Sequence, residues 1–282
     1  MGETTYSLSR NGFTDLKLAN SFLNPVVSKQ NTQIPIVVFI PVVVFLLIGA
    51  GLSPVSLAQE SLELVSPASK TQFASDDPEL KPMFTKDSFA GWVQLGGKSK
   101  YEIKDGVITG TCIAGEPNSF MSTGMDYTNF EMEVEFKAHP AMNSGIQIRS
   151  HCFANPTEFK LADGKIRKIA AERVHGYQVE IDPSKTRHSG GIYDEARRRW
   201  LVNLKNNPTA REAFKPNEWN HLRIKCDGDH LQTWINGVVA VDLKDDVTAS
   251  GFIALQVHGA NGRKHMFNTT VQWRNIRIKL LD

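Results

Sequence analysis

Short runs in which apolar and polar residues alternate recur along most of this sequence, and they constrain its fold more than any other feature. The run YQVEID at residues 177–182 alternates strictly. Because successive side chains of a strand point to opposite faces of a sheet, such a run predicts a strand with one core face and one polar face. Comparable runs occur at residues 107–108, 130–136, 146–149, 222–226, 231–235, 238–243, 252–257 and 271–278. The pattern predicts an all-β protein.

Turn residues separate these runs. Asp227-Gly228-Asp229 and Asn236-Gly237 each lie between two apolar runs and predict hairpins, while Pro183 ends the 177–182 strand. After Ser189-Gly190-Gly191 we expect a short strand with Ile192, Tyr193 and Asp194. More than eight antiparallel strands in about 200 residues favour one jelly-roll sandwich of two antiparallel sheets.

Only residues 160–174 have a composition compatible with a helix, and Gly164 interrupts them. We expect a loop excursion there with a helical turn or two. Its basic residues make it a candidate lid over a site, although a solvated surface loop explains them equally well.

The amino-terminal part differs from the rest. Residues 34–52 form an unbroken apolar run after Arg10, Lys17 and Lys29, and small residues follow at Ser56 and Ala58. We interpret residues 1–58 as an export signal cleaved before Gln59, or as an uncleaved membrane anchor. Residues 59–79 read as a linker and residues 80–282 as the folded domain. The expected location is the periplasm or the cell surface, with membrane contact only through an uncleaved anchor.

Charge and cysteine content exclude several classes. A formal net charge of +2 gives no field that favours nucleic acid. Cys112, Cys152 and Cys226 are widely spaced and odd in number, so at most one disulfide can form, and buried free thiols are the simpler interpretation. No clustered Cys/His pattern predicts a zinc site. No glycine-rich strand-turn-helix element is present to hold a nicotinamide or a flavin.

Seven segments, in order, resemble one protein family. They are MF through FAGW at residues 83–92, EIKDGVITG at 102–110, NSGIQIR at 143–149, GGIYD at 190–194, EWN at 218–220, WING at 234–237 and WRNIRI at 273–278. Over residues 82–281 the chain is similar to the DUF1080 family, the 3-keto-disaccharide hydrolase or 3-keto-glucoside lyase/hydratase domain. The resemblance implies a concanavalin A-like jelly roll. It also implies action on glycosides oxidised to a ketone at carbon 3.

Such a substrate dictates the residues that are needed. The ketone acidifies the proton on carbon 2, so a base removes it and the enolate expels the group on carbon 1; water can then add to the enone. We expect His258 or Glu180 as the base, Arg149 and Tyr193 to steady the enolate, and Asp182 or Asp194 to handle the leaving-group proton. Substrate-binding candidates are Asn143, Gln147, Gln178, Asp194, Arg198 and Gln256.

Two other functional classes stay open, and so does the cofactor. The sequence EIDPSK at residues 180–185 nearly spells ExDxxE, the signature of laminarinase-like retaining glycosidases, but Lys185 stands where the last carboxyl belongs. A carbohydrate-binding module without catalysis is the other class. No cofactor is certain, yet Glu180, Asp182, Asp194 and His258 together offer ligands for a divalent metal ion.

Overall fold

The computed structural model describes residues 72–84 and 87–282. The proposed export signal at 1–58 and residues 59–71 of the expected linker lie outside the described residues. Within the described part, no helix is both long enough and apolar enough to cross a membrane.

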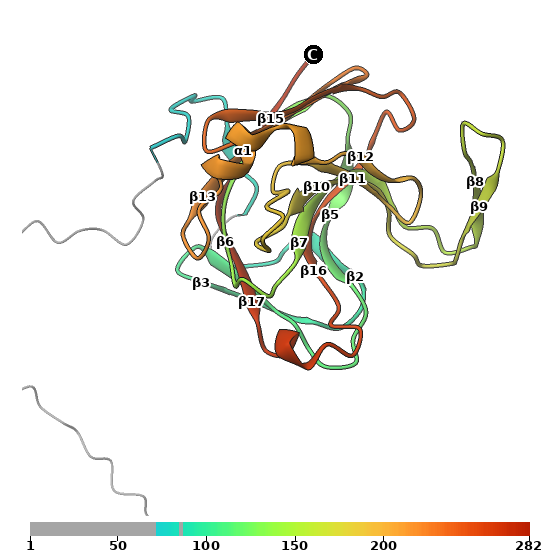
Figure 1. Cartoon of the computed structure of the whole chain (residues 1–282), viewed down its shortest axis with the longest axis horizontal. Coiled ribbons are helices and arrows are strands. Elements are labelled where there is room, and N and C mark those ends of the chain that lie inside the picture. Colours follow the sequence, from blue (N-terminus) through green and yellow to red (C-terminus); the bar gives the residue numbers. More distant parts are fainter. Residues whose placement is uncertain (1–71, 85–86) are drawn as a thin grey trace, which may run out of the picture. The chain divides into compact units, whose positions relative to one another are not determined.

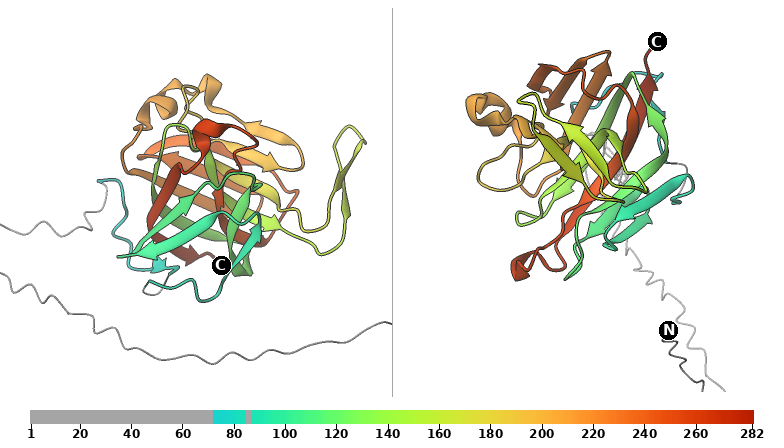
Figure 2. Two further views of the ribbon diagram at one scale, coloured as in Figure 1. Left: turned by 90° about the horizontal axis from the view of Figure 1, so that it is seen from below. Right: turned by 90° about the vertical axis from the view of Figure 1, so that its right-hand side faces the viewer.

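Two large antiparallel sheets make up the domain (Figures 1 and 2). Sheet A has the order β15 (Val238–Lys244), β14 (His230–Ile235), β13 (Asn220–Asp227), β6 (Phe130–Ala138), β17 (Thr270–Leu280), β4 (Val107–Thr111) and β3 (Lys100–Lys104), and β1 (Lys81–Pro82) pairs with β17. Sheet B has the order β12 (Arg199–Val202), β11 (Ile192–Glu195), β10 (His175–Ile181), β7 (Ser144–His151), β16 (Gly251–Val257), β5 (Ser119–Tyr127) and β2 (Trp92–Gly96). The predicted jelly-roll sandwich is confirmed.

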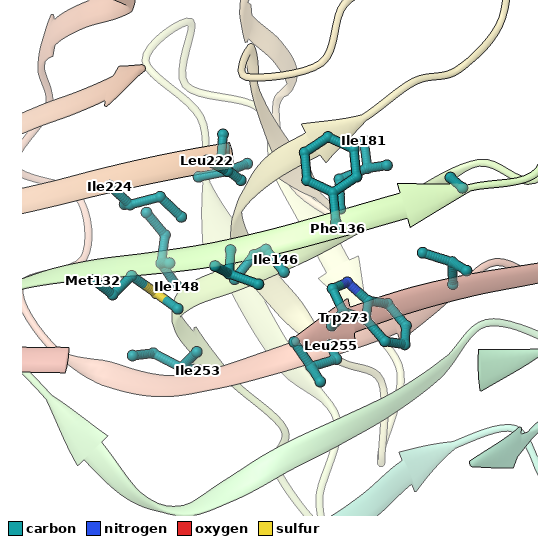
Figure 3. Packing of buried hydrophobic residues seen from close by; sticks show 14 of the residues in the cluster. Met132, Phe136, Ile146, Ile148, Ile181, Leu222, Ile224, Ile253, Leu255 and Trp273 are labelled. Carbon is teal, nitrogen blue, oxygen red and sulfur yellow. The ribbon is translucent and has the colours of Figure 1, made fainter. Parts of the chain in front are cut away.

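The hydrophobic core lies between the sheets, as Figure 3 shows. Sheet A contributes Met132, Phe136 and Trp273, each no more than 1% exposed, and sheet B contributes Ile146 and Leu255, which are fully buried. One side chain in two therefore faces the core along each central strand. The alternate residues of sheet B, on its outer face, are free to form a site.

Both predicted hairpins are present. The β13–β14 turn contains Gly228 (φ +57°), and the β14–β15 turn is Asn236-Gly237, with φ of +47° and +79°. Two successive positive φ values are what a two-residue turn between twisted strands requires, and Asn-Gly adopts them at low cost. These turns fix the register of the edge of sheet A.

The expected helical turns in residues 160–174 are not there. This stretch instead forms most of a two-stranded hairpin, β8 (Thr157–Lys160) and β9 (Ile166–Ile169), which projects beside the sandwich in Figure 1. The Asp163 carboxylate accepts a hydrogen bond from the Lys165 backbone N–H (3.0 Å), and Gly164 has φ +84°. This turn reverses the chain, so no helix can propagate.

The helices of the described part are short and lie elsewhere. They are η1 (Leu204–Asn206), α1 (Pro208–Ala213) and η2 (Lys264–Met266). The three cysteines are free thiols, with Cys112 and Cys226 buried and Cys152 partly buried.

The last residues of the expected linker contact sheet A. The backbone N–H of Ser75 donates to the Glu133 carboxylate at 3.2 Å, and the Arg277 guanidinium donates to the Ser75 carbonyl at 2.7 Å. The ordered packing on the domain therefore begins before residue 80.

Candidate functional site

A polar cleft of about 660 Å³ lies on the outer face of sheet B. Its central strands contribute Gln178 and Glu180 from β10 and Tyr193 from β11, and His258 directly follows β16. Each belongs to the phase of its strand that points away from the core. The alternation seen in the sequence thus brings these side chains to one surface.

The strand register places a glycine between Glu180 and the β16 side of the cleft. Gly145 on β7 pairs with Glu180 on one side and with Gln256 on the other. A Cβ atom at Gly145 would lie 2.5 Å from Cγ of Gln178, so only glycine leaves room for the Gln178 side chain there. Because adjacent strands lie ~4.8 Å apart, Glu180 and the β16 residues face each other across ~10 Å of backbone. That gap is wide enough for one sugar ring.

Glu180 is the most perturbed acid in the cleft. Its side chain is only 5% exposed, and burial raises its pKa from 4.5 to about 7. Amide N–H groups of Asn143 and Gln178 donate to its two carboxyl oxygens and oppose this rise, while the charge of Asp182 adds to it. Glu180 therefore exchanges a proton close to neutral pH.

A buried amide chain fixes the orientation of Glu180. The Gln147 side chain donates to Oε1 of Gln178 (2.6 Å), and Nε2 of Gln178 donates to Oε2 of Glu180 (2.9 Å). Gln147 itself is fully buried and accepts a hydrogen bond from Ser150 (2.7 Å). Gln147 thus supports the cleft from behind rather than lining it.

Asp182 has the opposite electrostatic character. Burial alone would raise its pKa, but hydrogen bonds outweigh burial and hold the pKa below its usual value. Its carboxylate accepts from the Thr186 hydroxyl (2.6 Å) and from the backbone N–H groups of His188 and Ser184 (both 3.0 Å). Asp182 stays ionised and its oxygens are occupied by the loop that follows β10.

His258 is held as a neutral imidazole. Burial lowers its pKa below 6.5, and the nearby Arg263 adds to this effect. Nδ1 lies 2.7 Å from the carbonyl oxygen of Gly259. A carbonyl only accepts hydrogen bonds, so Nδ1 carries the proton, and Nε2 of the neutral ring keeps a free lone pair. His258 is therefore suited to accept a proton from a bound ligand.

Cations and a third carboxyl group complete the cleft lining. Arg263 lies at the His258 side, with Nη2 3.4 Å from the imidazole Nδ1. Arg173 lies at the β11 side, where it forms an ion pair with Glu195. Burial raises the pKa of Glu195, although the Arg173 charge acts against this. Each end of the cleft thus offers a guanidinium group.

Arg149 is not in the cleft, contrary to expectation. Its φ is +43°, and the pairing of β7 with β16 shifts register at this point. Its guanidinium donates to the carbonyl oxygens of Thr128 and Gly228, both at 2.7 Å. The bulge redirects the side chain away from the face of Gln147, so strand alternation does not hold there. Arg149 neither pairs with Glu180 nor reaches a ligand beside it.

Asp194 and Arg198 also lie away from the cleft. Asp194 is fully buried and pairs in register with the core residue Tyr177. It binds Arg197 and Arg198 at 2.7 Å and 2.5 Å, and Arg198 also binds Asp245 at 2.7 Å. These residues form an ion network that anchors the β11–β12 turn. We had expected Asp194 and Arg198 to contact the substrate, not to stabilise this turn.

Gln256 shares the outer face of sheet B but does not line the cleft. Its side chain is fully buried, and its amide atoms have no hydrogen-bond partner among the described residues. The expected lid is also missing, because Arg173 is the one basic residue of the stretch 160–174 that lines the cleft. Residues 160–169 of that stretch belong to the projecting hairpin, and Val174 is buried in a cluster with Phe120 and Phe252.

The proposed metal ligands are not gathered together. Among residues 72–84 and 87–282, no three His, Cys, Asp or Glu side chains lie close enough to hold a metal ion. Asp194 faces the core, and the Asp182 oxygens already have hydrogen-bond donors. The ligand set Glu180, Asp182, Asp194 and His258 is therefore not assembled.

Several cleft residues were not predicted from the sequence. Glu195 has the same strand phase as Tyr193, so alternation would have found it had the strand been extended by one residue. Arg263 and Trp200 follow a loop and a turn whose geometry no local pattern fixes. Their positions follow only from the folded chain.

The fold and the cleft define an all-β sandwich protein with a cleft lined by ionisable side chains on the outer face of one sheet. The sequence match to the family described as the 3-keto-alpha-glucoside-1,2-lyase-like domain covers residues 79–279. The chain therefore belongs to this family of carbohydrate-related proteins. No curated protein shows significant sequence similarity to it.

Solved structures with a similar chain path are distant in sequence. The carbohydrate-binding module CBM66 from Bacillus subtilis is 15% identical, with 70% of this chain and 99% of that chain covered and a TM-score of 0.46. A candidate glycosyl hydrolase from Parabacteroides distasonis is 18% identical, with 70% and 91% covered and a TM-score of 0.45. A Bacillus subtilis protein of unknown function with a galectin-like fold is 10% identical, with 71% and 94% covered and a TM-score of 0.49.

Proposed function

We propose that this protein cleaves 3-keto-glycosides by removing the proton on carbon 2 and eliminating the group on carbon 1. The observation that carries the proposal is the pairing of a neutral imidazole with a protonatable carboxyl group across one cleft. Burial lowers the pKa of His258 below 6.5 and raises that of Glu180 to about 7. Two titratable groups whose environments bring them to complementary protonation states are typical of acid–base catalysis.

His258 is assigned as the base. Its Nε2 takes the proton from carbon 2, and the electron pair of the broken C–H bond moves into an enolate whose charge lies on the carbon 3 oxygen. Arg263, beside His258, is the cation placed to stabilise that oxygen. This assignment replaces Arg149, which the β7 bulge removes from the cleft.

Glu180 is assigned as the acid. When the enolate collapses, the carbon 3 carbonyl reforms, a double bond forms between carbons 1 and 2, and the bond from carbon 1 to the leaving oxygen breaks. The Glu180 carboxyl group gives its proton to that oxygen. Asp182 is unsuited to this step because its pKa is held low by three hydrogen-bond donors. Water addition to the enone would complete a net hydrolysis.

This assignment implies a defined pH dependence. The active form needs neutral His258 and protonated Glu180, so activity should fall below the lowered pKa of His258 and above about 7, the pKa of Glu180. The optimum is therefore expected between the lowered pKa of His258 and that of Glu180, on the acidic side of neutrality.

A leaving-group series tests the assignment. In Glu180→Gln, turnover of a methyl 3-keto-glucoside should fall by ~10²–10⁴, since methoxide requires protonation as it leaves. A 4-nitrophenyl 3-keto-glucoside should react at nearly the wild-type rate, since nitrophenolate leaves without a proton. His258→Ala should lose turnover of both substrates. Equal losses on both substrates in Glu180→Gln would contradict the acid role.

The retaining glycosidase is less well supported by the cleft. That mechanism needs a free carboxylate nucleophile about 5–5.5 Å from the acid. Asp182 is the neighbouring carboxylate, and the Thr186 hydroxyl and two backbone N–H groups occupy it. Turnover of an unoxidised glucoside at a rate matching its 3-keto form would favour the glycosidase. Saturable binding without turnover of either compound would favour a carbohydrate-binding module.

We also propose that the protein is exported through its amino-terminal segment. The apolar run at residues 34–52 and the small residues at Ser56 and Ala58 support this interpretation.

A further inference from the structure

An aromatic cluster forms one wall of the cleft at the edge of sheet B. Trp200 on the edge strand β12 pairs in register with Tyr193 on β11, and the two rings are 5.4 Å apart in an edge-to-face arrangement. The His188 ring also packs edge-to-face against the indole, with 5.3 Å between the ring centroids. Trp200 is nevertheless 37% exposed. An indole held by two rings and left open to the cleft is a rigid flat surface.

This surface lies next to the acid Glu180. The backbone N–H of Glu180 donates to the carbonyl of Gly191, the residue directly before the neighbouring strand β11 (2.9 Å). A Cβ atom at Gly191 would lie 3.1 Å from Cζ3 of Trp200, so the indole covers the backbone at this glycine. The Trp200 ring therefore begins one strand, ~4.8 Å, away from Glu180. His258 lies on the opposite side of Glu180, two strands away.

Buried ion pairs hold the aromatic wall in place. The pairing of β11 with β12 shifts register beside Tyr193, and Arg199, directly before Trp200, has φ +70°. Bulges of this kind redirect a side chain. The preceding turn is fixed by the network of Asp194 with Arg197 and Arg198. The wall is thus presented by a turn that has few ways to rearrange.

We propose that the Trp200 wall is the leaving-group subsite and selects glycosides whose leaving group has a flat apolar face. This inference rests on the proposed function, because it follows from the order of residues across the cleft. With the base His258 at carbon 2 and the acid Glu180 at the carbon 1 oxygen, the leaving group extends beyond Glu180 onto the indole. An aromatic ring and the apolar face of a second sugar share the required chemistry.

Three substrates and the full chain test the subsite. The methyl, phenyl and glucosyl 3-keto-glucosides carry the same reacting ring, but a methyl group is too small to cover the indole. Trp200→Ala should lower kcat/KM for the phenyl or glucosyl substrate by about 10–200-fold, the usual effect of lost apolar contacts, and change the methyl substrate less than about twofold. Trp200→Phe should recover part of the loss. A larger effect on the phenyl or on the glucosyl substrate identifies which leaving group the wall prefers.

Trp234→Ala is the matched control, because Trp234 stacks under Arg223 on sheet A and lies outside the cleft lining. It should leave all three substrates unchanged. Equal losses for the methyl and the larger substrates in Trp200→Ala, or no loss for any, would overturn the subsite.

Binding measurements separate this proposal from the proposed function. If no 3-keto-glucoside is turned over, calorimetry with the unoxidised phenyl and methyl glucosides still tests the wall. Tighter binding of phenyl glucoside that disappears in Trp200→Ala would support a flat-ligand subsite without the proposed chemistry. Equal binding of both glucosides to the wild-type protein, or binding of neither, would overturn it.

Discussion

Replacing Glu180 with glutamine should remove a pH-dependent loss of stability. The side chain is 5% exposed, and burial raises its pKa from 4.5 to about 7. Between these values the folded state holds one proton more than the unfolded state, so the free energy of unfolding falls as the pH rises. The contribution of the neutral carboxyl group is complete below pH 4.5 and is lost as the pH rises through about 7.

The magnitude follows from the width of this interval. From 4.5 to about 7 is about 2.5 pH units, and each unit corresponds to about 1.4 kcal/mol, so wild-type protein should lose ~3–4 kcal/mol that the variant keeps. The variant should also differ from wild type by an amount of stability that does not change with pH, because the NH₂ group of the new glutamine faces the amide donors of Asn143 and Gln178. The change with pH is independent of that constant difference.

Urea denaturation of both proteins from about pH 4 to about pH 8 measures this change directly. Glu102→Gln is the matched control, since it alters an exposed carboxyl group on β3 whose side chain is 56% accessible. Its difference from wild type should stay nearly flat with pH. A flat difference for Glu180→Gln as well would refute the buried, neutral carboxyl group on which the acid role depends.

Three further predictions follow from the same geometry. Gly145→Ala places a methyl group 2.5 Å from Cγ of Gln178. We expect the free energy of unfolding to fall by ~1–3 kcal/mol. Turnover should fall as well, which distinguishes this variant from one that loses only stability. Asp194→Ala removes the carboxylate that binds the buried Arg197 and one of the two that bind Arg198, and it should cost ~3–5 kcal/mol in urea denaturation; a loss below about 1 kcal/mol would contradict the network. Amino-terminal sequencing of exported protein should begin at Gln59, whereas an intact amino terminus would indicate an anchor.

The sandwich was predictable because its information is local. Strict alternation at residues 177–182 sets which side chains face the core, and Asn236-Gly237 specifies a two-residue turn. Local composition gave a wrong prediction at residues 160–174, where charged and alanine residues indicated helical turns. There the turn at Gly164 decided the structure in favour of a hairpin.

Part of the site was predictable for the same reason. Alternation placed Glu180 and His258 on the outer face of sheet B, where both line the cleft. It failed at Arg149, because a bulge interrupts the strand. Asp194 has the phase of the core residue Ile192, so the prediction of a site role for Asp194 went against alternation. A strict reading of that phase would have excluded Asp194 from the start.

Residues on loops and turns could not be placed from the sequence. Arg263 reaches the cleft from the loop after β16, and Arg173 from the segment before β10. Their positions depend on contacts between distant parts of the chain. The order Trp200, Glu180, His258 across three non-adjacent strands likewise exists only once sheet B has formed.

The most direct test of the account follows the hydrogen on carbon 2 of the sugar. A 3-keto-glucoside carrying deuterium at that carbon is incubated with the full chain, and the rate and the products are compared with those of the unlabelled compound. Elimination through His258 predicts a primary isotope effect and release of the deuterium to solvent. Cleavage at an unchanged rate, with the deuterium retained in the product sugar, would contradict the proposed chemistry.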